Sequence, residues 1–190
     1  MGKIVISDNV SLDGVIEDPS GDEGSRVGGW LGHIADYKDL AQAALDEALG
    51  ADAWLLGRRS YEFFGSRWQS RAGALADRLN SLPKYVVSSS IQDPEWNNTT
   101  VLTGDVVSAV SKLKEEVAGE IIVPASFQLL RTLIEYDLVD EIRLMVFPVV
   151  LGAGARLFGE TNGSKRMRLV GIRTVDDEIA SLTYQLVRRA

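Results

Sequence analysis

Short apolar runs alternate with amphipathic stretches along most of the chain. Strands are predicted where such runs occur, at 3–7, 53–56, 84–88 and 120–123. Between them, apolar residues recur every three or four positions in segments such as 40–49 and 106–117, which is typical of helices with one buried face. Strands separated by helices pair in parallel through right-handed crossovers, so this part of the chain predicts a largely parallel sheet.

The last part of the chain changes this pattern. A long, mostly apolar run at 141–150 is followed by two strand-like segments, 168–175 and 179–188, which are joined by the polar turn Asp176-Asp177-Glu178. Strands joined in this way pair antiparallel. The predicted fold is an α/β three-layer sandwich with a mixed, mostly parallel central sheet, helices on both faces and antiparallel C-terminal edge strands. No linker or repeat interrupts residues 1–190, which predicts a single domain.

Charge and composition narrow the possible chemistry. The net charge of −7, from 20 basic and 27 acidic residues, argues against a general nucleic-acid-binding role, although a local basic cluster can still bind a phosphorylated small molecule. The chain has no cysteine and His33 is its only histidine, so we predict no metal site. No signal peptide is apparent, and no apolar run reaches the roughly 18 residues of a membrane span. We therefore expect a cytoplasmic protein without membrane contacts.

The segment after the predicted strand at 53–56 carries the strongest local signal. It reads Gly57, Arg58, Arg59 and Ser60. Ligands of open α/β sheets bind beyond the carboxyl ends of the strands, and the free N–H groups of a following helix attract anions there. Two arginines add positive charge that can hold a phosphate. The alternative is that both arginines are ordinary solvated surface residues.

Two other strand ends are candidates of the same kind. Ser88 and Ser89 close the strand at 84–88, where their hydroxyl groups can contact a nucleotide or simply belong to a loop. Gly152 and Gly154 follow the long apolar run. They either let a ligand or another backbone segment come close or form only a flexible turn.

The turn Pro124-Ala125-Ser126 lies between the strand at 120–123 and a predicted helix at 126–135. Ser126 can serve as the helix N-cap, and the amides of Phe127 and Gln128 would then point at a bound anion. A simple N-cap without any ligand would produce the same sequence.

The polar segment 11–32 is a long loop, and loops of this length inside compact domains are often functional. Asp13-Gly14 is a turn signal, but the Asp13 carboxylate is also available for substrate binding or proton transfer. Trp30 either covers a planar ligand or plugs the core. Asp36 is expected to cap the helix that follows the loop.

Taken together, these junctions resemble the dihydrofolate reductase superfamily, and most closely the branch that includes the reductase domain of riboflavin-biosynthesis deaminase-reductases. The resemblance covers nearly the whole chain. Its most specific blocks are ADAWLLGRRSYEFF, similar to the family's strand-Gly-Arg-x-Ser/Thr motif, and LLRTLIEYDLVDEIRLMVFPVVLGAGARLFGE, similar to its helix, Leu-Val-Asp-Glu, long strand and Pro-Val-x-Leu-Gly-x-Gly segment.

This resemblance implies an NADPH-dependent reductase that transfers a hydride to a small heterocyclic substrate, either a pterin or dihydrofolate-like compound or a riboflavin precursor of the 5-amino-6-ribosylaminouracil type. The implied cofactor contacts are Gly57, Arg58, Arg59 and Ser60 for phosphate, Ser88 and Ser89 for adenosine, and Ala125 and Ser126 for the pyrophosphate and nicotinamide side, with Gly152 and Gly154 at the same cleft. The resemblance implies that Ser11, Asp13 and Gly14 lie near the nicotinamide and the substrate, and Trp30 and Asp36, at the far end of the loop, are further substrate-side candidates. A homodimer is also expected.

Two departures from the family pattern leave a second interpretation open. The family has Gly-Gly or Gly-Ser where this chain has Ala125-Ser126, and an alanine is strained if that turn needs a left-handed or cis geometry. Classical dihydrofolate reductases bind the pterin through a carboxylate on the first helix, and neither Asp36 nor Asp39 matches that position. The alternative is a non-catalytic nucleotide-binding or structural relative with a degenerate cofactor turn.

Overall fold

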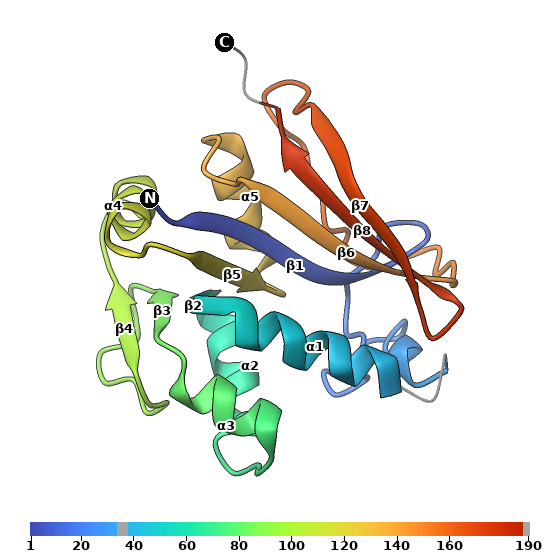
Figure 1. The fold of residues 1–190 in the computed structure, drawn as a ribbon, viewed down its shortest axis with the longest axis horizontal. Helices are drawn as coiled ribbons and strands as arrows, with labels where there is room; N and C mark the ends of the chain where they lie inside the picture. Colours follow the sequence, from blue (N-terminus) through green and yellow to red (C-terminus); the bar gives the residue numbers. More distant parts are fainter. Residues whose placement is uncertain (34–37, 188–190) are drawn as a thin grey trace.

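The computed structural model describes residues 1–33 and 38–187. Eight strands form one mixed sheet in the order β4-β3-β2-β5-β1-β6-β8-β7 (Figure 1). Their bounds are β1 Lys3–Ser11, β2 Ala51–Gly57, β3 Lys84–Val87, β4 Thr99–Leu102, β5 Glu120–Pro124, β6 Glu141–Phe147, β7 Met167–Val175 and β8 Ile179–Leu186. The strands from β4 to β6 pair in parallel, whereas β8 pairs antiparallel with both β6 and β7. The predicted fold class is confirmed.

Helices cover both faces of this sheet. They are α1 Lys38–Gly50, α2 Arg58–Trp68, α3 Ala74–Ser81, α4 Val106–Glu116 and α5 Phe127–Glu135, with a short 3-10 helix at Trp30–His33. The first three pack on one face and α4 and α5 on the other, as Figure 1 shows on either side of β1 and β5. None of the helices in the described part of the chain is long and apolar enough to cross a membrane.

Alternation along β1 explains this three-layer arrangement. Ile4 and Ile6 point into the core under α4 and α5, whereas Val5 packs with Trp54 and Trp96 under α1, α2 and α3. Successive side chains of a strand point to opposite faces, so one buried strand supplies two hydrophobic layers.

Several predicted boundaries need correction. The first strand runs on to Ser11, so that residue belongs to the sheet rather than to the loop, and β6 stops at Phe147 instead of continuing to residue 150. The helix after Gly57 starts at once with Arg58 and runs to Trp68. Asp36, the predicted cap of α1, lies outside the described residues.

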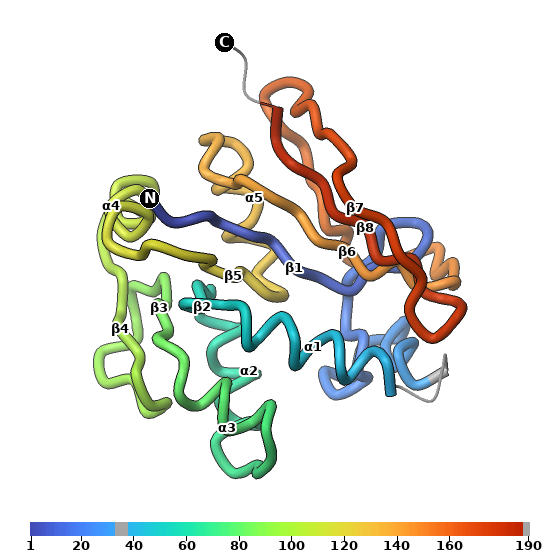
Figure 2. The backbone as a smooth tube through the Cα atoms, viewed as in Figure 1, coloured from blue at the N-terminus to red at the C-terminus, as the bar shows by residue number. Residues whose placement is uncertain are grey.

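The loop after β1 folds back onto the carboxyl end of β6. Figure 2 shows it beside the segment that follows β6 and near the tip of the β7–β8 hairpin. The amide of Leu12 donates to the carbonyl of Val149 at 2.9 Å, and the amide of Ile16 donates to the carbonyl of Ala155 at 2.9 Å. These hydrogen bonds join segments about 140 residues apart, beyond the carboxyl ends of β1 and β6.

Candidate functional site

The β2–α2 and β5–α5 junctions meet at the carboxyl edge of the sheet. The amide of Gly57 donates to Ser126 Oγ at 3.1 Å, and Ser60 Oγ donates to the carbonyl of Ala125 at 3.1 Å. Ser60 and Ser126 are both buried. Two of the predicted phosphate-binding segments therefore form one rigid unit, although 65 to 69 residues separate them in the chain.

These bonds also correct the predicted capping roles. Ser126 occupies the N-cap position of α5, but its hydroxyl donates to the carbonyl of Pro124 at 3.0 Å and makes no cap hydrogen bond. Gly57, at the same position of α2, has no side chain with which to cap. Amides of the first turn of each helix, including those of Arg58, Phe127 and Gln128, are thus left without a side-chain cap, and such groups attract anions.

The turn between these junctions is strained at Ala125. This residue has a φ of +49°, in the left-handed region that L-residues other than Asn and Asp seldom adopt, and it is exposed. No cis peptide bond occurs among the described residues. The turn thus has the left-handed geometry in which an alanine is strained. A glycine would adopt this geometry without strain.

Both predicted phosphate-binding arginines are exposed and paired with carboxylates. Arg58 Nη1 lies 3.0 Å from Glu62 Oε1 one turn along α2, and Arg59 Nη2 lies 3.2 Å from Glu23 Oε2 in the long loop. The arginine side chains are 49% and 63% exposed. Exposed pairs of this kind are worth at most about 1 kcal/mol, so a phosphate with its higher charge can replace the carboxylates.

Ser88 and Ser89 differ in how accessible they are. Ser88 is buried, and its Oγ accepts the amides of Ser90 and Ile91, each at 3.1 Å, whereas Ser89 is exposed. A cavity of about 460 Å³ lies between α2 and the segment 90–95. Because Ser89 is exposed, its side chain is accessible to a ligand, whereas the hydroxyl of Ser88 is used within the turn.

Asp13 is fixed within a turn. Its carboxylate accepts hydrogen bonds from the Ser11 hydroxyl at 2.7 Å and from the amides of Leu151 and Gly152 at 3.1 and 2.9 Å. These bonds, that of Ser11 foremost, lower the pKa of Asp13 to about 2. The lowered pKa favours the ionised carboxylate at neutral pH, and a role of Asp13 in proton transfer stays a prediction.

The other predicted substrate-side residues also have structural partners. Ser11 is buried, and Gly14 adopts the left-handed φ of +83° that the turn requires. Trp30 is 2% exposed, stacks edge-on against Phe147 at 5.3 Å and donates to the carbonyl of Glu17, so in this structure it plugs the core. Substrate contacts by these residues stay predictions.

The two glycines after β6 both contact the loop that follows β1. The amide of Gly152 is used by Asp13. A side chain at Gly154 would come within 2.8 Å of Val15 and 3.0 Å of Val27, so this glycine allows a close approach of the loop rather than leaving open space for a ligand. Glu17 adds a further tie by accepting the amide of Ala155 at 2.7 Å.

Comparison with known proteins identifies this architecture. Residues 3–181 match the model of the RibD C-terminal domain. The chain belongs to this family. Among its relatives, the uncharacterized protein YyaP of Bacillus subtilis (strain 168) is 27% identical over 187 residues, which cover 96% of this chain and 94% of YyaP.

Solved structures share the fold of this RibD C-terminal domain. A putative riboflavin biosynthesis protein from Shewanella sp. PV-4 superposes with a TM-score of 0.77 at 22% identity, covering 98% of this chain and 99% of that one. Dihydrofolate reductase from Enterococcus faecalis, complexed with NADP(H) and RAB-propyl, superposes with a TM-score of 0.62 at 14% identity, covering 97% and 96%. The chain therefore has a dihydrofolate-reductase-like fold, and reductases of this fold use NAD(P)H.

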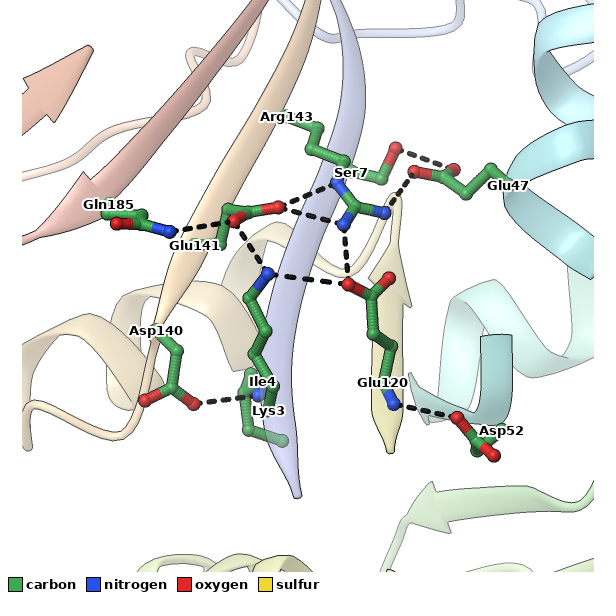
Figure 3. Close-up of polar contacts among 10 residues, drawn as sticks. All are labelled: Lys3, Ile4, Ser7, Glu47, Asp52, Glu120, Asp140, Glu141, Arg143 and Gln185. Atoms are coloured by element: carbon green, nitrogen blue, oxygen red, sulfur yellow. Dashed lines mark hydrogen bonds and ion pairs between the residues drawn. The ribbon is translucent and has the colours of Figure 1, made fainter. Parts of the chain in front are cut away.

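An ionic network that the sequence did not predict lies on the α1 face of this RibD C-terminal domain (Figure 3). Arg143 of β6 contacts Glu141 and Glu120 at 2.8 Å each and Glu47 of α1 at 3.6 Å. Lys3 contacts Glu141 at 2.6 Å and Glu120 at 3.3 Å. Three carboxylates thus face two cations, which leaves an excess of negative charge.

Ser7 is a second residue of β1 that joins the network, besides Lys3. Its hydroxyl donates to Glu47 Oε2 at 2.8 Å (Figure 3). Ser7 directly precedes Asp8 in the chain. Burial raises the pKa of Glu47. The network therefore joins α1 to the central strands β1, β5 and β6.

Proposed function

We propose that this RibD C-terminal domain is an NADPH-dependent reductase that transfers a hydride to a small heterocyclic substrate. Two substrate types fit the proposal, a pterin or dihydrofolate-like compound and a riboflavin precursor of the 5-amino-6-ribosylaminouracil type. The observation that carries the proposal is the union of two uncapped helix N-termini with Arg58 and Arg59 at the carboxyl edge of the sheet.

The residues present fit a dinucleotide at this edge. The amides of Phe127 and Gln128 would receive the pyrophosphate, and Arg58 and Arg59 would hold a further phosphate by exchanging their carboxylate partners for it. The exposed Ser89 would lie on the adenosine side. When bound, the nicotinamide supplies the hydride, while the protein orients the reactants and excludes water.

The proposed preference for NADPH over NADH rests on the two arginines. A ligand that binds only the folded state raises the melting temperature, so NADPH at millimolar concentration should do so and NADH should do so less. Arg58→Ala should weaken NADPH more than NADH. Arg173→Ala, which removes the same charge from the distant strand β7, is the matched control. Equal losses for both cofactors in Arg58→Ala would mean that Arg58 does not contact the 2′-phosphate.

A second candidate function is a nucleotide-binding relative without catalysis. It is favoured by Ala125, whose methyl group stands in the strained turn where the family has glycine. The two candidates give different results in one assay. The reductase oxidises NADPH, followed by absorbance, when dihydrofolate or 5-amino-6-ribosylaminouracil is added. A protein that binds NADPH but oxidises it with neither compound supports the non-catalytic alternative.

A further inference from the structure

Asp8 is an unusual residue for its place in β1. Its side chain is on the same face of the strand as those of Ile6 and Val10, which are both core residues. Its Oδ1 accepts the amide of Asn9 at 3.0 Å, but its Oδ2 is shielded from solvent and has no partner. No other shielded side-chain oxygen or nitrogen in residues 1–33 and 38–187 lacks one. Unsatisfied buried polar atoms are costly and rare, and they often mark a functional site.

The position of Asp8 is set by the stagger of the sheet. The β1–β5 ladder ends with Ser7 opposite Pro124, whereas the β1–β6 ladder runs on to Ser11. Continuing the first register by one residue would put Ala125 beside Asp8, but the chain turns away there at a φ of +49°. Asp8 is thus the first residue of β1 beyond the carboxyl end of β5, where ligands of open α/β sheets bind.

The surroundings of Asp8 favour its protonated form. Burial raises the pKa of its carboxyl group to about 7; the amide of Asn9 opposes this, and the charge of Glu47 on α1 adds to it. Its β6 partner Leu144 is apolar. The buried α5 residues on the same face are also apolar, namely Leu129, Leu130, Leu133 and Ile134.

Asp8 and Asp13 therefore have opposite properties, although both belong to the segment at the end of β1. Hydrogen bonds hold Asp13 ionised, whereas burial lets Asp8 keep a proton near neutral pH. Pairs of carboxyl groups with widely separated pKa values commonly divide acid and charge-holding roles at active sites.

We propose that Asp8 is the proton donor of the reductase reaction, a role that rests on the function proposed above. The acceptor carbon of a C=N or C=O group gains the hydride and forms a C–H bond. The π electron pair moves to the nitrogen or oxygen, which takes the proton from Asp8 Oδ2. NADPH is oxidised to NADP⁺, and the Asp8 carboxylate regains a proton from water. The substrate class is then a heterocycle or carbonyl compound whose reduced heteroatom must be protonated.

The test compares the wild-type protein with Asp8→Asn, which keeps the shape of the side chain and removes the titrating proton. Asp46→Asn is the matched control, because Asp46 is exposed on α1 and bonded to Gln42. NADPH oxidation is measured from pH 5.5 to 9 with dihydrofolate and with 5-amino-6-ribosylaminouracil, and NADPH binding is measured by thermal shift. We expect the wild-type rate to fall about tenfold per pH unit above pH 7.

Asp8→Asn should bind NADPH as the wild type does but turn over about 100-fold more slowly at pH 6, without the decline above pH 7. A merely structural role would not remove that decline. Normal NADPH binding with an unchanged rate and pH profile in Asp8→Asn would overturn the role of Asp8 alone. No NADPH binding by the wild type would overturn the proposed function itself.

A second measurement decides the matter if neither acceptor is reduced. Carboxyl ¹³C resonances are titrated, and the Asp8 signal is the one absent from Asp8→Asn. A midpoint near pH 7 that moves when NADPH is added supports the proposal. A midpoint at or below pH 5 overturns it.

Discussion

Replacing Ala125 by glycine should stabilise the protein, which is unusual for a change to glycine. Ala125 has a φ of +49°, and a left-handed conformation costs an L-residue about 1 to 2 kcal/mol. Glycine removes this strain but adds about 0.5 to 1 kcal/mol of conformational entropy to the unfolded chain. Because Ala125 is exposed, little packing is lost with its methyl group. The net expectation is a gain of about 0.5 to 1 kcal/mol.

Thermal unfolding of Ala125→Gly and Ala72→Gly measures this difference. Ala72 is also exposed in a loop, but it is not among the residues with positive φ. For a chain of this size, 1 kcal/mol corresponds to about 2 to 4 °C, so Ala125→Gly should melt about 1 to 4 °C higher than the wild type and Ala72→Gly lower. If both variants lose stability to the same extent, the turn is not strained and its departure from glycine has no energetic meaning.

Three other changes have expected outcomes. Because the pKa of Asp8 is raised, its protonated form stabilises the fold at low pH, and this stabilisation is lost as pH rises from about 4 to 7. In urea unfolding, the free energy of unfolding of the wild type should fall by about 2 to 3 kcal/mol between pH 5 and 8, and that of Asp8→Asn should not. Lys84 is fully buried and donates to the carbonyls of Asn80, Leu82 and Asn97, so Lys84→Met should cost about 2 to 4 kcal/mol, and a cost below 1 would contradict these bonds. If the predicted homodimer forms through the exposed edge strand β7, Ile172→Glu should sediment as a monomer, while an unchanged sedimentation coefficient would place the interface elsewhere.

Periodicity was sufficient to predict the architecture, because the alternation of apolar runs and amphipathic segments is a local property. The location of the candidate site also followed locally, since Gly57-Arg58-Arg59-Ser60 and Pro124-Ala125-Ser126 each end a strand. The partners of Ser60 and Ser126 did not follow, because each serine bonds to the other junction across 65 or more residues. Ser126 occupies the predicted N-cap position, but its hydroxyl makes no cap hydrogen bond.

Asp8 shows a different limit of sequence reasoning. A polar residue in a β-strand usually faces solvent, so the pattern IVISDNV gave no reason to single it out. Asp8 is half-buried, and the shielding of its Oδ2 depends on where β5 ends relative to β1; that stagger is a property of the assembled sheet. The turn role of Asp13 was the ordinary alternative for an Asp-Gly pair, but the acceptance of two amides from residues 151 and 152 could not be read from the sequence.

Binding of NADPH at the joined β2–α2 and β5–α5 junctions can be followed by amide chemical-shift mapping of ¹⁵N-labelled protein. Addition of NADPH should move the amide resonances of Arg58, Arg59, Phe127 and Gln128, which form the two helix starts, and leave those of the distant strand β7 in place. An absence of shifts at millimolar NADPH, or shifts confined to residues away from these two helix starts, would contradict the proposed cofactor site.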